Sequence, residues 1–384
     1  MKVVLSVDPV KFPLTGIGRY TYELGKSLQA ELQEQLRFLR GYRITTELPT
    51  ATDNRPMATP PAWKRLAQQN ALVVGAFRRL NPWLKARALK GLEDHVFHGP
   101  NYYLPPFGGR SVVTIHDLSH YVWTQGHPPE RVRYMQAEME LSLKRASALI
   151  TDTEYTRQEV ACFFGWPLDK IHAVHLASGP EFAPRSLEEL KQPLAAHGLA
   201  PGGYSLFTGT VEPRKNIGTL LDAYGRLPAS LQSNCPLVVC GYRGWQSDAL
   251  HRRLQEAQDQ GWVKYLGFVP NEALPLLMAG ARLFVYPSHY EGFGLPVLEA
   301  MASGVPVVCS NATTLPEVSG GAAVMHDPND VDALFECLLR GLEDDIWRNQ
   351  ARHQGLIQAG RFSWARCARE TMAVYQAVSN DGSR

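Results

Sequence analysis

The chain has 384 residues, which is long for one hydrophobic core and comfortable for two α/β domains. Apolar residues make up 45% and charged residues 20%, the profile of a soluble globular protein, and a net charge of +2 gives no global attraction for nucleic acid. The six cysteines are scattered without a CxxC pair, which fits neither a disulfide framework nor a zinc site and predicts a cytoplasmic protein. No apolar run is long enough to span a membrane.

In the first half of the chain, short apolar segments alternate with helical stretches, which predicts a parallel sheet built from βαβ units. The opening MKVVLSVDP indicates a strand rather than a signal peptide, because its apolar run is too short. The expected strands are 3–7, 94–98, 111–115, 148–151 and 171–174. The expected helices are 18–32, 131–145 and 153–164.

A glycine-containing loop, PLTGIGRY, follows the first strand and precedes a helix. In that position Gly16 and Gly18 could bring backbone amides close to a diphosphate. The loop lacks the third glycine of a dinucleotide fingerprint, and a tight turn is the alternative interpretation.

The segment between residues 61 and 91 is basic, aromatic and free of acidic residues. Its basic residues are Lys64, Arg65, Arg78, Arg79, Lys85, Arg87 and Lys90, and its large aromatic residues are Trp63, Phe77 and Trp83. Basic helices with interleaved aromatics can lie on an anionic membrane surface. The alternatives are peripheral membrane contact through residues 63–90, on the inner face of the cytoplasmic membrane, or ordinary amphipathic helices packed on the first domain.

Polar residues follow two strands of the first half. The strand in VVTIHDLSHYVW delivers His116 and Asp117 at its carboxyl edge, where ligands bind in α/β sheets. A lone histidine is commonly structural, but this location favours a role in the site. The neighbouring HGPNYYLPP, with Asn101, is expected on the acceptor side, as is Asp117.

Residues 175–186, with two prolines and no periodicity, predict a linker. The alternation then restarts, with strands expected at 204–208, 236–240, 263–266, 283–286 and 307–309. Two such series predict two doubly wound Rossmann-like domains, 1–185 and 200–363, facing each other across a cleft. The terminal segment, 364–384, predicts a helix that crosses back to the first domain.

Two adjacent cations, Arg214 and Lys215, stand in FTGTVEPRKNIGTLLDAY between a strand and a helix. Adjacent basic residues are commonly a solvated surface. At a strand end, however, they suit a diphosphate leaving group, because they can neutralise the charge that develops when the bond to it breaks.

Two glutamates flank a glycine-containing turn in YPSHYEGFGLPVLEAMASG. Glu291 lies in the loop after a strand, and Glu299 lies about one turn into the helix that starts near Pro296. Gly292 and Gly294 let backbone amides approach a ligand, and the helix N-terminus favours an anion. Carboxylates beside an anion site make sense as acceptors for sugar hydroxyls; the alternative is a surface loop with a charge near the helix start.

Glu291 and Glu299 in this setting resemble the signature of the retaining glycosyltransferases of the GT-B fold, family four. The resemblance implies that Glu291 contacts donor hexose hydroxyls and Glu299 the nucleotide ribose. It further implies that the His116 imidazole bonds the sugar 6-hydroxyl and that the His116 carbonyl faces the oxocarbenium-like charge. Arg214 and Lys215 are implied to bind the diphosphate. The remaining donor contacts are implied for the backbone of Phe293, Gly294 and Leu295, at the sugar and phosphate, and for Phe268 and Val269, at the base.

The implied reaction transfers a hexose from a nucleoside diphosphate sugar to a hydroxyl of a growing, lipid-linked glycan, with retained stereochemistry. His116, Arg214, Lys215 and Glu291 are the expected catalytic residues. No DxD motif stands at a strand end, so no metal or other cofactor is expected to be required.

The stretches TIHDLSHYVWTQGHPPERVRY and ALITDTEYTR resemble bacterial transferases that use GDP-mannose or GDP-rhamnose to build lipopolysaccharide O-antigen. UDP-glucose remains an alternative donor. A dinucleotide oxidoreductase is disfavoured by the incomplete glycine fingerprint. A non-catalytic nucleotide- or glycan-binding module would not need the four catalytic candidates together.

Overall fold

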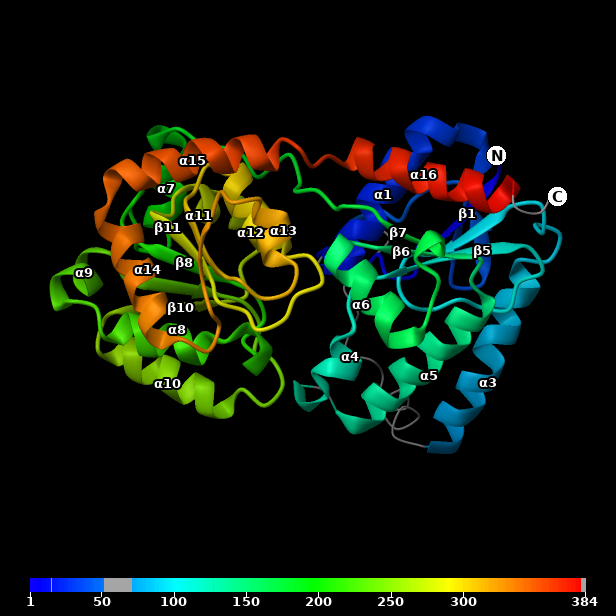
Figure 1. The fold of residues 1–384 in the computed structure, drawn as a ribbon, viewed down its shortest axis with the longest axis horizontal. Helices are drawn as coiled ribbons and strands as arrows, with labels where there is room; N and C mark the ends of the chain where they lie inside the picture. Colours follow the sequence, from blue (N-terminus) through cyan, green and yellow to red (C-terminus); the bar gives the residue numbers. More distant parts are fainter. Residues whose placement is uncertain (15, 52–70, 127, 381–384) are drawn as a thin grey trace.

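The computed structural model describes residues 1–14, 16–51, 71–126 and 128–380, which form two α/β units side by side (Figure 1). Each unit is built on one twisted sheet with helices packed against it. The prediction of two Rossmann-like domains with parallel sheets is therefore confirmed.

The first domain holds a seven-stranded sheet in the order β3-β2-β1-β4-β5-β6-β7. All neighbouring pairs are parallel except β2 and β3, which are antiparallel. The strands are β1 (Val3–Ser6), β2 (Leu36–Arg40), β3 (Arg43–Thr45), β4 (Val96–Gly99), β5 (Arg110–Ile115), β6 (Ala148–Thr151) and β7 (Ile171–Ala173). The helices are α1 (Gly16–Leu32), α3 (Ala71–Ala88), α4 (Ser119–Val122), α5 (Pro129–Arg145) and α6 (Glu154–Phe164), with short 3₁₀ turns at Gln33–Gln35, Thr124–Gly126 and Leu168–Lys170.

The second domain holds a six-stranded, wholly parallel sheet in the order β10-β9-β8-β11-β12-β13. Its strands are β8 (Ser205–Thr208), β9 (Leu237–Cys240), β10 (Val263–Gly267), β11 (Leu283–Tyr286), β12 (Val307–Ser310) and β13 (Val324–His326). Its helices are α7 (Leu187–Ala195), α8 (Ile217–Gly225), α9 (Ala229–Asn234), α10 (Asp248–Asp259), α11 (Leu274–Ala279), α12 (Leu295–Ala302), α13 (Leu315–Ser319), α14 (Val331–Glu343) and α15 (Asp345–Ala359), with a 3₁₀ turn at Pro213–Lys215.

Burial on both faces explains why the central strands are continuous apolar runs instead of alternating ones. All four residues of β1, β8, β9, β11 and β12 are buried between the flanking helices. The cysteines that end two of these runs, Cys240 and Cys309, are buried thiols, as their apolar surroundings predict.

The last helix, α16 (Trp364–Asn380), extends from the second domain over the first and packs on α1 (Figure 1). There the Tyr375 hydroxyl and Nδ1 of His98 are 2.6 Å apart in a hydrogen bond. The chain therefore passes between the domains twice, once after β7 and once before α16.

Three strands were missing from the sequence prediction: β2, β3 and β13. Strand β2 is interrupted by Arg37 and ends at the exposed Arg40, and β3 (RIT) and β13 (VMH) each carry polar residues, so none stands out as an apolar run. In the predicted basic segment, Trp63, Lys64 and Arg65 lie outside the described residues. Residues 71–88 form the helix α3, with Pro82 inside it, and Lys90 lies in the turn that follows. No described helix has the length and apolarity needed to cross a bilayer.

Candidate active site

A cavity of about 410 Å³ lies between the domains, where the carboxyl ends of both sheets meet. It is lined by residues of both domains that the sequence analysis singled out. These are Gly16, His116, Asp117, Arg214, Lys215, Phe268, Val269, Glu291, Phe293, Gly294, Leu295 and Glu299. Loops after β1 and β5 contribute from the first domain, and loops after β8, β10 and β11 contribute from the second.

Glu291 is the centre of a buried ionic cluster. Its Oε1 accepts a hydrogen bond of 2.6 Å from the Lys215 ammonium, and its Oε2 accepts one of 3.2 Å from the Arg214 guanidinium. Burial opposes ionisation, but these two cations outweigh it and lower the pKa of Glu291 to about 2. Lys215 also donates to the Tyr286 hydroxyl at 2.6 Å, and Arg214 pairs with Glu212 at 2.9 Å. Burial opposes the charge on both cations: Glu291 and Glu212 outweigh it and raise the pKa of Arg214, whereas burial lowers the pKa of Lys215 although Glu291 acts in the opposite direction.

The loop that carries Glu291 is fixed by two threonines that precede α13. The backbone amide of Glu291 donates to Thr313 Oγ1 at 3.0 Å, and the Thr314 hydroxyl donates to the carbonyls of Glu291 and Phe293 at 3.2 and 3.0 Å. Gly294 then turns the chain into α12 with a φ of 98°, a left-handed conformation that favours glycine.

Glu299 is buried on α12 at the same cavity, away from the lysine. Burial raises the pKa of its carboxyl to about 7, although Arg19 acts in the opposite direction. Arg19 itself is paired with Glu181 in the segment between the domains. Arg19 therefore adds a third cation to the cavity, beside Arg214 and Lys215, and it comes from the first domain near the start of α1.

His116 is held from two sides within the first domain. Its Nδ1 lies 2.7 Å from a carboxylate oxygen of Asp152, at the end of β6, and its Nε2 lies 2.9 Å from the carbonyl of Pro100. Burial opposes a charge on the ring, but Asp152 outweighs it and raises the pKa of His116. Because both nitrogens face acceptors, the predicted hydrogen bond from this ring to a sugar hydroxyl requires the ring to give up the contact with Pro100.

The backbone of His116 meets the Glu291 loop directly. A Cβ atom built on Gly292 would lie 2.0 Å from the His116 carbonyl oxygen, so only glycine allows the two chains to approach this closely. Asp117 accepts hydrogen bonds from the amide and hydroxyl of Ser119, at 2.9 and 2.7 Å, and thereby shapes the loop after β5.

An exposed aromatic pair borders the other end of the cavity. Tyr242 and Phe268 stack with ring centroids 4.6 Å apart and an interplanar angle of 17°. About half of each side chain is exposed, and Val269 beside them is buried. A planar group could stack on this pair.

Two predicted residues do not line the cavity. Gly18 is buried in the first turn of α1, where an added Cβ would lie 2.9 Å from the carbonyl oxygen of Pro9, so it serves packing rather than ligand approach. Asn101 lies in the segment after β4 and is not among the lining residues. Arg19, Asp152 and Tyr286 line the cavity but were not predicted. Two of them had a local signal in the sequence: Arg19 directly follows Gly18, and Asp152 directly follows the expected strand 148–151.

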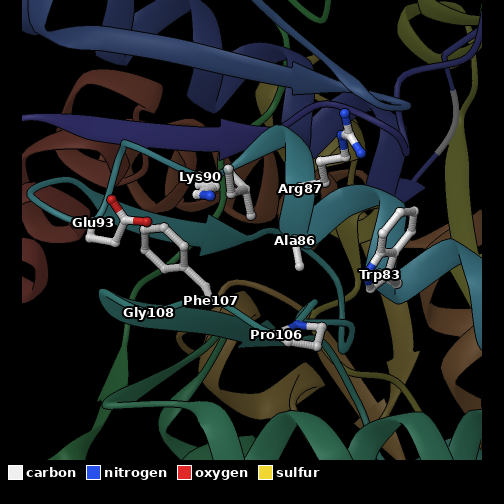
Figure 2. A pocket seen from close by; sticks show the side chains of 9 residues that line it. Trp83, Ala86, Arg87, Lys90, Glu93, Pro106, Phe107 and Gly108 are labelled. Atoms are coloured by element: carbon white, nitrogen blue, oxygen red, sulfur yellow. The ribbon is translucent and has the colours of Figure 1, made fainter.

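A larger hollow, about 880 Å³, lies on the opposite edge of the first sheet (Figure 2). Its lining includes residues just before β4 and β5, so it opens at the amino ends of these strands. None of the predicted donor or catalytic residues lines it. Size alone therefore does not identify the reaction site.

Family models match both halves of the chain. "Glycosyltransferase Family 4" matches residues 14–177 and "Glycosyl transferases group 1" matches residues 200–358. Among solved structures, the chain is similar to Anabaena Alr3699/HepE in complex with UDP and glucose, with a TM-score of 0.71, 17% identity and coverage of 98% and 100% of the two chains. It is also similar to WaaG, a glycosyltransferase involved in lipopolysaccharide biosynthesis, with a TM-score of 0.68, 14% identity and coverage of 97% and 99%.

Among curated proteins, the chain is 44% identical to O-antigen chain mannosyltransferase B of Escherichia coli, over 98% of this chain and all of that protein. It is 34% identical to the serotype-specific mannosyltransferase WbdA of Escherichia coli over 67% of this chain, but spans only 32% of WbdA. The chain is an enzyme of the GT-B glycosyltransferases, with the group 1 and family 4 domains in its second and first halves.

Proposed function

We propose that the protein transfers a mannosyl residue from GDP-mannose to a hydroxyl of a growing, lipid-linked O-antigen polysaccharide. The observation that carries this proposal is the interdomain cavity, which gathers a buried Glu291–Lys215–Arg214 cluster, Glu299 and His116 around one space. The names of the similar proteins favour mannose as the transferred sugar. GDP-rhamnose and UDP-glucose are the alternative donors.

In this proposal the donor spans the cavity from the aromatic pair to the first domain. The base stacks on Tyr242 and Phe268, the ribose hydroxyls donate to Glu299, and the hexose hydroxyls donate to Glu291. The backbone of Phe293, Gly294 and Leu295 at the start of α12 faces the diphosphate and sugar, since a helix N-terminus favours an anion.

Arg214 and Lys215 would stabilise the leaving group. As the bond between the anomeric carbon and the diphosphate oxygen breaks, negative charge grows on that oxygen, and two fixed cations in a buried site lower the energy of this state. The acceptor oxygen forms the new bond to the anomeric carbon on the same face, and its proton passes to the departing diphosphate. The carbonyl of His116, at the opposite wall beside Gly292, can face the positive charge on the sugar.

A covalent route through Glu291 is disfavoured by its contacts. Both carboxylate oxygens are engaged by cations, and its pKa of about 2 marks a weak nucleophile. A front-face substitution therefore fits the site better: the acceptor attacks on the side from which the diphosphate leaves, its proton passes to that diphosphate, and the anomeric configuration would be retained.

Transfer from radiolabelled GDP-mannose to a synthetic lipid-linked mannosyl acceptor tests the proposal. We expect an α-linked product, with GDP-rhamnose and UDP-glucose at least tenfold slower, and no product with Glu291→Gln. Glu188→Gln, on the exposed surface of α7, is the matched control and should retain wild-type rates. Equal turnover of UDP-glucose would reject the donor assignment.

We propose further that α3 and the hollow beside it form a peripheral contact with anionic membrane lipid. Leu80 and Trp83 are more than half exposed, and Arg87 and Lys90 are exposed nearby. Figure 2 shows Trp83 and Arg87 at one end of the hollow and Phe107 and Glu93 toward the other. The aromatic side chain of Trp83 beside the cations Arg87 and Lys90 suits the boundary between lipid headgroups and acyl chains.

Vesicle flotation tests this contact. Phosphatidylglycerol vesicles should carry the wild-type protein upward, and phosphatidylcholine vesicles should not. Trp83→Ala should weaken flotation several-fold, whereas Trp245→Ala, an equally exposed tryptophan of the second domain, should not. Equal loss in both variants, or none in either, would reject α3 as the contact.

A further inference from the structure

Glu317 of the second domain binds the N-terminus of a helix in the first domain. Its Oε1 accepts the backbone N–H of Glu154 at 2.8 Å, and its Oε2 accepts that of Tyr155 at 3.1 Å. These are the first two residues of α6, whose amides have no partner within the helix. A carboxylate at this position is favoured by hydrogen bonding and by the helix dipole.

The same helix end contacts the loop that carries Glu291. Thr153, the N-cap of α6, and Thr156 in its first turn both direct hydroxyls to the carbonyl oxygen of Gly292, at 3.4 and 3.3 Å. Asp152, which orients His116, is the residue before Thr153. The start of α6 thus lies between the two halves of the cavity.

Within its own domain, Glu317 is three residues from the group that fixes the Glu291 loop. It belongs to α13, and Thr314, the residue before that helix, donates to the carbonyls of Glu291 and Phe293. The position of α13 is therefore linked to that of the Glu291 loop through Thr313 and Thr314, which directly precede the helix.

A histidine completes the contact at the place where the chain passes between domains. Nε2 of His175 lies 2.7 Å from Glu317 Oε1. The His175 ring packs edge-on to Phe362 and lies beside Phe293, with centroids 5.4 and 6.3 Å apart. His175 is in the first interdomain segment and Phe362 in the second, so both passages and the loop meet at this cluster.

We propose that Glu317 is a positioning residue that latches the Glu291 loop onto the first domain. It acts by holding α13 against α6 and His175, so that the loop carrying Glu291 and Gly292 stays beside His116. This inference rests on the donor site proposed above. It predicts that Glu317 supports turnover without contributing to nucleotide affinity, because Glu317 does not line the cavity.

Glu317→Ala tests the latch, with Glu317→Gln as the conservative variant and Glu188→Ala as the exposed control. We expect Glu317→Ala to lower kcat about tenfold and change the Kd for GDP less than twofold. Glu317→Gln should recover to within about threefold of wild type, because its amide oxygen can still accept from one of the two α6 amides, although its NH2 group cannot accept from the other. Hydrogen exchange should accelerate at both Glu154 and Tyr155 in Glu317→Ala, and at no more than one of them in Glu317→Gln.

The proposal is overturned if kcat in both Glu317 variants equals that of wild type, or if GDP affinity falls in parallel with kcat. Should Glu317→Ala fail to fold, an unchanged kcat in Glu317→Gln with accelerated exchange at Glu154 and Tyr155 would likewise overturn it. If the wild-type protein turns over no nucleotide sugar, the proposed donor site fails, whereas the exchange rates still report whether Glu317 holds α6.

Discussion

The carboxyl of Glu299 gives the most quantitative test of the cavity. Its pKa rises from 4.5 to about 7 because it is buried with only partial compensation from Arg19. The native state thus holds this proton more tightly than the unfolded chain does. The contribution of Glu299 to the free energy of unfolding is therefore greatest where the group is protonated in both states, and this contribution falls as the pH rises from about 4.5 through 7.

The size of the effect follows from the pKa difference. A difference of about 2.5 corresponds to about 3.4 kcal/mol, at about 1.36 kcal/mol per pKa unit. Roughly 1 kcal/mol of this stabilisation is already lost at pH 5. Water reaching the cavity reduces the remaining effect, so we expect the contribution of Glu299 to the free energy of unfolding to fall by about 2 kcal/mol between pH 5 and pH 8. Glu299→Gln removes the ionisation, so the free energy of unfolding of the variant minus that of wild type should rise by about 2 kcal/mol between pH 5 and pH 8.

Urea unfolding of wild type and Glu299→Gln, from pH 5 to pH 8, measures the difference. Glu291→Gln is the opposite control: because its pKa is about 2, its carboxylate stabilises the fold above the unfolded value of 4.5, and the variant should be less stable at pH 7. A stability difference between Glu299→Gln and wild type that does not change with pH would refute the reasoning.

Three further predictions concern the reaction. Lys215→Met should lower kcat by about two orders of magnitude, because one of the two cations at the leaving group is lost. Initial rates at saturating donor measure kcat, and a value within threefold of wild type would contradict the prediction. Gly292→Ala should lower kcat while leaving the Kd for GDP within about twofold, since its Cβ would clash with the His116 carbonyl. Calorimetry of GDP binding measures the Kd and steady-state rates measure kcat, and an unchanged kcat would contradict the prediction. Turnover should be unchanged in excess EDTA, because Arg214 and Lys215 supply the positive charge; a loss restored by Mg²⁺ but not by Ca²⁺ would contradict the proposal that no metal is required.

Sequence patterns could predict the parts of the fold that depend on local chemistry. The buried strands β8, β9, β11 and β12 are apolar runs, and the loops after β8, β9 and β11 carry glycines and charges of the site. The short β3 and β13 were missed, and in the folded chain they are defined by their pairing with the neighbouring strands β2 and β12.

Contacts between distant residues could not be predicted in the same way. Arg19 meets Glu181 across 162 positions, and His116 meets Asp152 across 36, so no local spacing connects them. The motif position of Gly18 suggested ligand approach, and the folded chain adds a second reason for a glycine there, because an added Cβ would lie 2.9 Å from the Pro9 carbonyl oxygen. The pairing of Glu291 with both Lys215 and Arg214 also became visible only in the folded chain.

The most direct test of the central claim is nucleotide release without acceptor. Purified protein is incubated with GDP-mannose, GDP-rhamnose and UDP-glucose in turn, and free GDP or UDP is quantified beside the Lys215→Met variant. Slow release of GDP from GDP-mannose, lost in the variant, is the predicted result. Release from none of the three donors, or equal release by wild type and variant, would contradict the assignment of this cavity as the donor site.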